Sequence, residues 1–226
     1  MIPLRDNIPS KKFPFINYLI IAVNAVVFFY QVRLMMNGAY EHFIMDYGLI
    51  PVKLLEDFGA YWKNIFYSMF MHGGFMHFIG NMLFLYIFGD NVEDRVGHLG
   101  YIVFYLFSGI VAALAQVLVS PGSSVPMIGA SGAIAGVLGA YFLLYPRARV
   151  LTLILFGFLI KTIELPAFLF LGFWFILQMF SGTLSLGAAK GDVGGVAFWA
   201  HSGGFLAGIV WVILFVKRPQ RYRTTF

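Results

Sequence analysis

Long apolar runs separated by short polar segments dominate the chain. Six of the runs have roughly the length, about 20 residues, with which a helix crosses the hydrocarbon core of a bilayer. They cover residues 14–36, 75–90, 100–119, 128–145, 165–181 and 198–216. The pattern therefore predicts an all-α, polytopic membrane protein that forms a six-transmembrane-helix bundle.

Two connections do not follow this pattern. Residues 37–64 mix aromatic, aliphatic and charged side chains, and this stretch is longer than ordinary connections between helices. Its apolar content favours a structure that lies in the membrane interface. Residues 147–164 are apolar but contain Lys161 and Glu164. We interpret them as an interfacial segment on the cytoplasmic side, with a short extra span as the alternative.

Composition supports a membrane protein without a soluble domain. The 226 residues are 60% hydrophobic and 11% charged, with a mean hydropathy of +0.83, whereas soluble domains are about 25% charged. We divide the chain into a short cytoplasmic lead (1–13), a membrane domain (14–216) and a basic cytoplasmic tail (217–226). The lead and the tail are too short to fold as domains.

The excess of basic residues fits membrane topology rather than nucleic-acid binding. With the N-terminus in the cytoplasm, eleven of the fifteen Lys and Arg residues face that side. These eleven are Arg5, Lys11, Lys12, Arg95, Arg147, Arg149, Lys161, Lys217, Arg218, Arg221 and Arg223, and the other four are Arg33, Lys53, Lys63 and Lys190. Positive charge concentrates on the cytoplasmic side of membrane proteins, so we expect a multi-pass protein of the cell membrane with both termini in the cytoplasm.

Polar groups at membrane depth are rare, and each suggests a functional site. Three clusters contain them: HGGFMHFIGN with His77 and Asn81, GASG with Ser131, and AHSGG with His201. His77 and Asn81 are four residues apart, on one face of a helix. The predicted spans place all four groups at one depth near the outer surface.

This convergence suggests nucleophilic catalysis. A serine acts as a nucleophile when a base lies within hydrogen-bond reach, and His201 fits that role. The oxyanion of the tetrahedral intermediate requires preorganised donors, which His77, Asn81 and the backbone N–H of Ser131 supply. The chain has no cysteine and no H-E-x-x-H motif, so we expect neither a metal nor a cofactor.

Small residues surround the serine and the histidine. Gly132 and Gly136 form one G-x-x-x-G pattern, and Gly204 and Gly208 form another. Such faces let two helices approach closely, which would bring Ser131 and His201 together. The alternative is a packing seam without catalysis, because these patterns occur in membrane proteins of every function.

The motifs resemble those of the rhomboid family of intramembrane serine proteases. GASG at 129–132 matches the family's G-x-S-G, AHSGGFLAG at 200–208 its A-H-x-G-G-x-x-x-G, and HFIGN at 77–81 its H-x-x-x-N. The resemblance implies a rhomboid-like bundle with residues 37–64 as a membrane-embedded first loop. It implies that Ser131 is the nucleophile, His201 the base, and His77 and Asn81 the oxyanion donors, with Gly129 among the site glycines. Substrates would be single-pass or multi-pass membrane proteins, which reach the site from the lipid bilayer beside the fifth helix.

Two positions depart from the family pattern. The Trp-Arg pair that ends the first loop in many relatives is replaced by Tyr61-Trp62-Lys63. Some relatives carry a Tyr four residues after the serine, where it stacks on the catalytic His. This chain has Ala135 there, so another group must orient the ring of His201.

Two other functions remain open from the sequence. One is a catalytically silent rhomboid-like protein, which the presence of Ser131 and His201 disfavours. The other is a small transporter or channel that uses Lys161 and Glu164 as a charged relay. We favour a salt bridge at the membrane interface as the explanation of that pair, and such a bridge contributes little.

Overall fold

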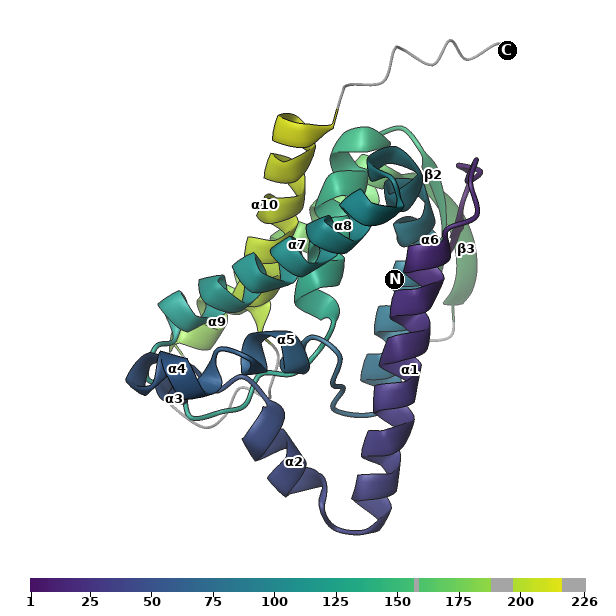
Figure 1. Cartoon of the computed structure of the whole chain (residues 1–226). Coiled ribbons are helices and arrows are strands. Elements are labelled where there is room, and N and C mark those ends of the chain that lie inside the picture. Colours follow the sequence, from purple (N-terminus) through teal and green to yellow (C-terminus); the bar gives the residue numbers. More distant parts are fainter. Residues whose placement is uncertain (157–158, 188–196, 217–226) are drawn as a thin grey trace, which may run out of the picture.

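The computed structural model describes residues 1–156, 159–187 and 197–216 (Figure 1). Six long helices form a bundle: α1 (Phe15–Met36), α6 (Phe75–Val96), α7 (His98–Val119), α8 (Ser131–Leu144), α9 (Ala167–Gly187) and α10 (Phe198–Phe215). Four short helices lie between α1 and α6: α2 (Tyr40–Tyr47), α3 (Pro51–Glu56), α4 (Phe58–Tyr61) and α5 (Asn64–Ser68). Three strands complete the described fold: β1 (Ile2–Asp6), β2 (Arg149–Phe156) and β3 (Leu159–Pro166). The tail 217–226 and residues 188–196 lie outside the described residues.

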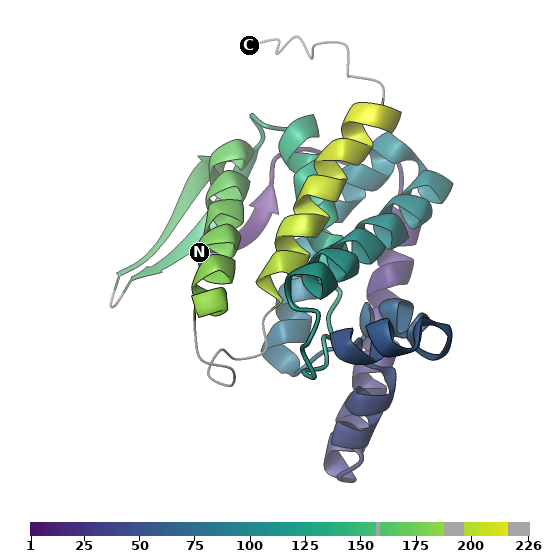
Figure 2. The same cartoon turned by 90° about the vertical axis from the view of Figure 1, so that its left-hand side faces the viewer.

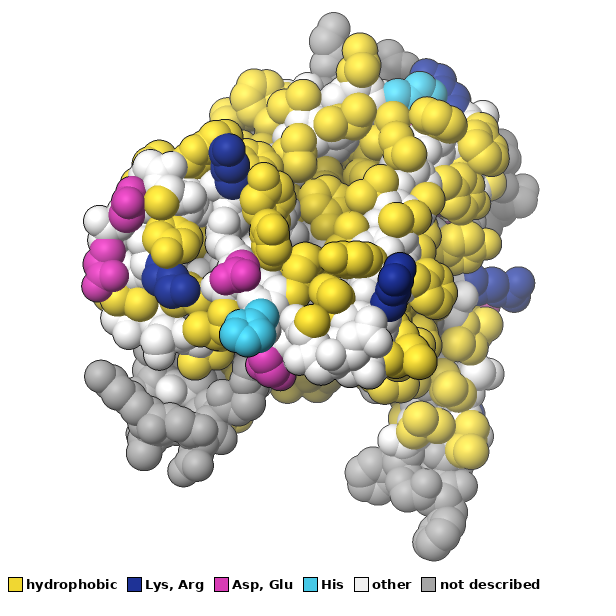
Figure 3. All heavy atoms as spheres, turned by 60° about the horizontal axis from the view of Figure 1, so that its bottom comes forward, with side chains coloured by type: hydrophobic (Ala, Val, Ile, Leu, Met, Phe, Trp, Pro, Cys, Tyr) yellow, Lys and Arg dark blue, Asp and Glu magenta, His cyan; other side chains and the backbone are white. Residues whose placement is uncertain are grey.

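Each predicted span overlaps one of the six long helices, and α6, α7 and α9 extend beyond the predicted bounds. Among the described residues, four helices are long and apolar enough to cross a membrane: α1, α7, α9 and α10. α8 has 14 residues, which gives a length of about 21 Å. α6 has 22 residues but carries Asp90, Glu93, Asp94 and Arg95 near its end. The surface is largely hydrophobic when viewed from the bottom of Figure 1, with few charged side chains (Figure 3).

α8 is the central helix of the bundle. All nine residues from Ala133 to Tyr141 are buried, so α8 contacts protein rather than lipid on every side. It packs against α10, α7, α6 and α9. Its shortness therefore does not leave it exposed to the bilayer.

Glycines bring the backbones of α8 and α10 into contact. A β-carbon at Gly204 would overlap the carbonyl oxygen of Gly132, and one at Gly208 would overlap that of Gly136. The two G-x-x-x-G patterns thus face each other. Gly136 also faces α7, because a β-carbon there would overlap the side chain of Ser108. Gly129 precedes α8 and adjoins His77 instead of α10.

Residues 147–164 do not form an extra helical span. They contain the antiparallel hairpin β2–β3, and β1 pairs with β2 to give a three-stranded sheet in the order β1-β2-β3. The hairpin lies beside α9 (Figure 2). The all-α expectation was wrong to this extent: the protein is mostly helical but contains a sheet. The apolar run of β2 is β-branched at Val150, Thr152 and Ile154, with Val150 and Thr152 fully buried on one face of the strand.

The N-terminal lead is attached to the bundle through this sheet. The Tyr141 hydroxyl donates a hydrogen bond to the Asp6 carboxylate, and the backbone N–H of Arg149 donates to Asn7 Oδ1 at 2.7 Å. The Asn91 amide donates to the carbonyl of Ile8 at 3.0 Å. Burial raises the pKa of Asp6, against the opposing effect of its hydrogen bonds. These contacts connect β1 to α6 and α8.

The short helices α2–α5 lie at the end of the bundle where α6, α8 and α10 begin (Figure 1). The backbones of Leu49 and Met127 exchange two hydrogen bonds, of 3.0 and 2.8 Å. The Asn64 amide donates to the carbonyls of Asp46 and Gly48, both at 2.9 Å. Residues 37–64 are therefore a structured segment that supports the loop leading into Ser131.

The backbone contact between α8 and α10 predicts a large effect of adding one methyl group. Gly204→Ala should lower the melting temperature of the detergent-solubilised protein, because overpacking typically costs about 1 to 3 kcal/mol and the backbone of α8 cannot move aside cheaply. Gly100→Ala in α7 is the matched control, since its new β-carbon would meet only Val96 at 3.7 Å. Equal melting temperatures for the two variants would contradict this account of the seam.

Candidate active site

Ser131 is the first residue of α8. The loop before it turns at Gly129, whose φ of +138° is accessible mainly to glycine. The Gly129 N–H donates to the carbonyl of Ser68 at 2.9 Å. A β-carbon at Gly129 would lie 2.9 Å from His77 Nε2 and 3.3 Å from Ser131 Oγ. Glycine therefore lets the ring of His77 approach Ser131, and the first N–H groups of α8 have no partner within the helix.

His201 and Ser131 form a hydrogen bond. The distance from His201 Nε2 to Ser131 Oγ is 2.7 Å. His201 is in the first turn of α10, and the start of that helix is anchored to α7, because Gln116 Oε1 accepts from the backbone N–H groups of Trp199 and Ala200 at 3.2 and 3.3 Å. The α8–α10 seam and this anchor together fix the position of the pair.

The second ring nitrogen of His201 is also paired. His201 Nδ1 lies 2.7 Å from Gln178 Oε1 on α9. The ring of Trp174, one turn earlier on the same helix, lies 5.8 Å from the His201 ring at an interplanar angle of 36°. α9 thus orients the imidazole, whereas position 135 holds only a buried alanine. Sequence reasoning missed both residues, although a glutamine within an apolar span was an available signal.

His77 is held in one orientation by its surroundings. Its Nδ1 accepts a hydrogen bond from the Gly73 N–H at 3.3 Å, so the neutral ring carries its proton on Nε2, the nitrogen nearest Gly129 and Ser131. The ring packs edge-on against His72 with centroids 5.2 Å apart. His72 is fully buried, and its backbone hydrogen-bonds to Gln31, which indicates a supporting role.

Asn81 lies one turn after His77 on α6. Only 8% of its surface is exposed, yet its Nδ2 has no hydrogen-bond partner among the described residues. An unpaired buried amide is unfavourable. Because Asn81 also lines a cleft, its N–H groups are available to donate to a molecule bound there.

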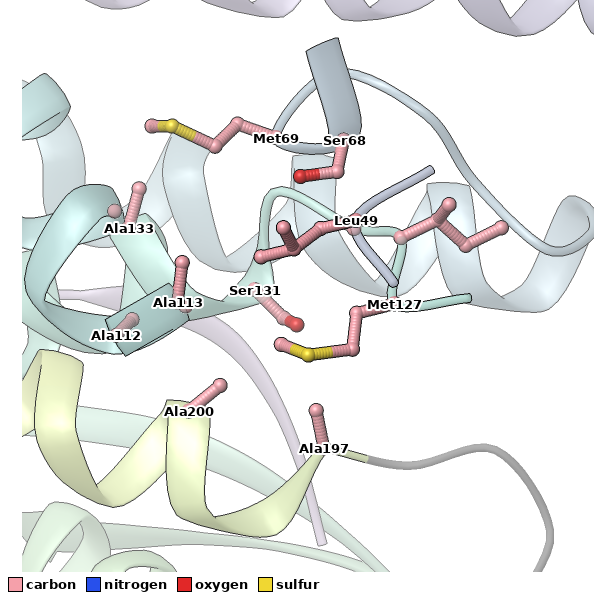
Figure 4. Close-up of a pocket in the computed structure, with 14 residues that line it drawn as sticks. Leu49, Ser68, Met69, Ala112, Ala113, Met127, Ser131, Ala133, Ala197 and Ala200 are labelled. Carbon is pink, nitrogen blue, oxygen red and sulfur yellow. The ribbon is translucent and has the colours of Figure 1, made fainter. Parts of the chain in front are cut away.

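A cleft of about 470 Å³ connects these groups. His77, Asn81, Ser131, Trp174 and His201 all line it, so it is bordered by α6, α8, α9 and α10. Ser131 also lines a smaller cavity of about 30 Å³, whose walls include Ala112, Ala113, Met127 and Ala200 (Figure 4). The structure therefore brings together all four polar residues predicted from the sequence.

Other predicted groups do not form a site. Lys161 and Glu164 are both exposed on β3, where a spacing of three places them on opposite faces of the sheet. No ion pair joins them within the described part of the chain. The relay interpretation assumed a helix and is not supported by this geometry. In the described ranges, no three His, Asp or Glu side chains are grouped as metal ligands would be.

The sequence model of the Rhomboid domain matches residues 59–218 of the chain. The chain belongs to the rhomboid family. The resemblance noted from the motifs is thereby confirmed, and with its apolar helices the protein is a multi-pass membrane protein.

Curated relatives come from plants, yeast and bacteria. Rhomboid-like protein 11, chloroplastic, of Arabidopsis thaliana is 32% identical over 80% of this chain and 61% of its own length. Rhomboid protein 1, mitochondrial, of Saccharomyces cerevisiae is 28% identical over 91% of this chain and 55% of its own length. Rhomboid protease GluP of Bacillus subtilis is 33% identical over 56% of this chain and 24% of its own length. The chain thus spans about three fifths or less of the length of these relatives.

Proposed function

We propose that this rhomboid-family protein is an intramembrane serine endopeptidase that cleaves transmembrane segments of membrane proteins. The observation that carries the proposal is the 2.7 Å hydrogen bond between Ser131 Oγ and His201 Nε2, formed in a cleft that also contains the unpaired amide of Asn81. Similarity to a protein named as a rhomboid protease supports the same reaction.

The reaction follows from the positions of these groups. His201 Nε2 removes the proton of Ser131 as Oγ attacks the scissile carbonyl carbon, which gives a tetrahedral intermediate. The Asn81 amide, the His77 Nε2–H and the backbone N–H of Ser131 donate to its oxyanion. His201 then protonates the leaving amine, and water hydrolyses the acyl-enzyme by the same steps. The mechanism uses no metal or cofactor.

The proposal includes the membrane topology. Together with α1, α7, α9 and α10, the helices α6 and α8 would complete six spans, with α8 shielded from lipid by its neighbours. Both termini would be cytoplasmic, and the cell membrane would be the location. Residues 37–64 would then lie in the outer interface, at the level of Ser131. Substrates would reach the cleft laterally, between α6 and α9.

Removal of either member of the pair should abolish the reaction. Ser131→Ala and His201→Ala should each prevent cleavage of a transmembrane substrate in detergent, and the double variant should lose no more than either single variant, because groups that act as one unit are non-additive. A fluorophosphonate should label the wild-type protein at Ser131.

The matched control for this experiment is Ser202→Ala. Ser202 neighbours His201, but its hydroxyl donates to the Phe198 carbonyl within α10, so this variant should retain cleavage. Substantial cleavage by Ser131→Ala would refute the serine mechanism. A folded wild-type protein that is never labelled would indicate the catalytically silent alternative.

Asn81 should act on the rate rather than on binding. Asn81→Ala should lower kcat by roughly 10- to 1000-fold with little change in KM, because its hydrogen bond forms as the oxyanion develops. The melting temperature should not fall, since the amide has no partner to lose. If KM alone changes, Asn81 belongs to substrate binding instead of transition-state stabilisation.

A further inference from the structure

We infer that Gln178 is a positioning residue for His201 in the Ser131–His201 pair. The inference rests on the proposed function and identifies the partner of the base. Its basis is the 2.7 Å contact between Gln178 Oε1 and His201 Nδ1, on the side of the ring opposite Ser131.

The direction of this hydrogen bond determines which nitrogen of His201 can act as a base. A neutral imidazole has one N–H and one acceptor nitrogen. When Gln178 Oε1 accepts from Nδ1–H, Nε2 is left with its lone pair directed at the Ser131 hydroxyl. If the Gln178 amide group were the partner instead, Nε2 would carry the proton and be unable to accept the proton of Ser131. In the structure Gln178 Oε1 faces Nδ1, so Nε2 is the nitrogen that can accept the proton of Ser131.

Gln178 differs from the other hydrogen-bonding side chains of α9. The Thr183 hydroxyl donates to the Met179 carbonyl at 2.8 Å, and the Ser185 hydroxyl donates to the Gly182 carbonyl at 2.6 Å. Both are local bonds within one helix. The Gln178 bond instead crosses to α10, 23 residues away in sequence. A partly buried amide that leaves its own helix to meet a histidine is poorly explained by helix stability alone.

The position of α9 controls this contact. Its outer side is exposed at Ile176, Phe180 and Leu184, which are 60–63% exposed. On the inner side, the Phe175 ring stacks on Phe205 of α10 with centroids 4.7 Å apart. Trp174, one turn before Gln178, lines the cleft. The packing of α9 on α10 therefore places Gln178 beside His201.

The experiment compares two substitutions of Gln178. Gln178→Met has a similar shape but no oxygen acceptor, and Gln178→Glu keeps an acceptor for Nδ1–H. The matched control is Thr183→Val on the same helix, whose hydroxyl bonds within α9. Three measurements are made on each purified full-length protein: the rate of fluorophosphonate labelling at Ser131, kcat and KM for a transmembrane substrate, and the ¹⁵N signals of the His201 imidazole.

Gln178→Met should lower both the labelling rate and kcat at least about 10-fold, because general-base catalysis contributes about 10²- to 10⁴-fold, while KM stays nearly unchanged. Its His201 ¹⁵N signals should shift towards a mixture of tautomers. Gln178→Glu should retain labelling within about threefold of wild type, and Thr183→Val should match wild type throughout.

Two results would overturn the inference. One is wild-type labelling and unchanged ¹⁵N signals in Gln178→Met. The other is equal loss of labelling and of melting temperature in Gln178→Met and Gln178→Glu, which would assign Gln178 to packing. Both leave the proposed function intact as long as the wild-type protein is labelled at Ser131. Failure of that labelling would instead refute the proposed function itself.

Discussion

The contact of the α8 backbone with the α10 backbone is the constraint on which the rest of the structure depends. Side chains between two helices normally keep their axes about 8 to 10 Å apart. Here Gly204 and Gly208 have no side chains, and they lie directly against the carbonyl oxygens of Gly132 and Gly136. Ser131 and His201 each lie within one turn of these glycines. Because the two backbones are in contact and leave no room for an additional methyl group, Ser131 and His201 come close enough to form a hydrogen bond of 2.7 Å.

Around this seam, most buried polar groups that meet the site have a defined partner. Gln116 anchors the start of α10, the Gly73 N–H fixes His77, and Gln178 fixes the far side of His201. Among the side chains that line the cleft, Asn81 is the exception, since its amide nitrogen is unpaired among the described residues. The paired groups hold their side chains in place, and in the proposed mechanism the unpaired amide of Asn81 donates to the developing oxyanion.

The sheet shows how a membrane bundle can include strands. β2 and β3 pair fully with each other, and β1 covers one edge of β2. This pairing satisfies backbone groups that an irregular connection of the same length would leave open. It also joins the N-terminal lead, the end of α8 and the start of α9 in one unit, so the helix that carries Gln178 is held at its other end by the sheet.

The sequence alone determined the helical membrane character, because apolar runs of span length have few alternatives, and each of the six runs overlaps a helix. It also predicted which polar residues would lie together, since Ser131, His201, His77 and Asn81 are costly at membrane depth unless they are paired or functional, and the structure places all four around one cleft. The sequence did not predict the secondary structure of residues 147–164, because an apolar run of that length suits a strand pair and a helix equally. The partner of His201 was decided by tertiary structure. Gln178 reaches the ring only because α9 packs on α10, and such a contact between helices leaves no periodic signal within either one.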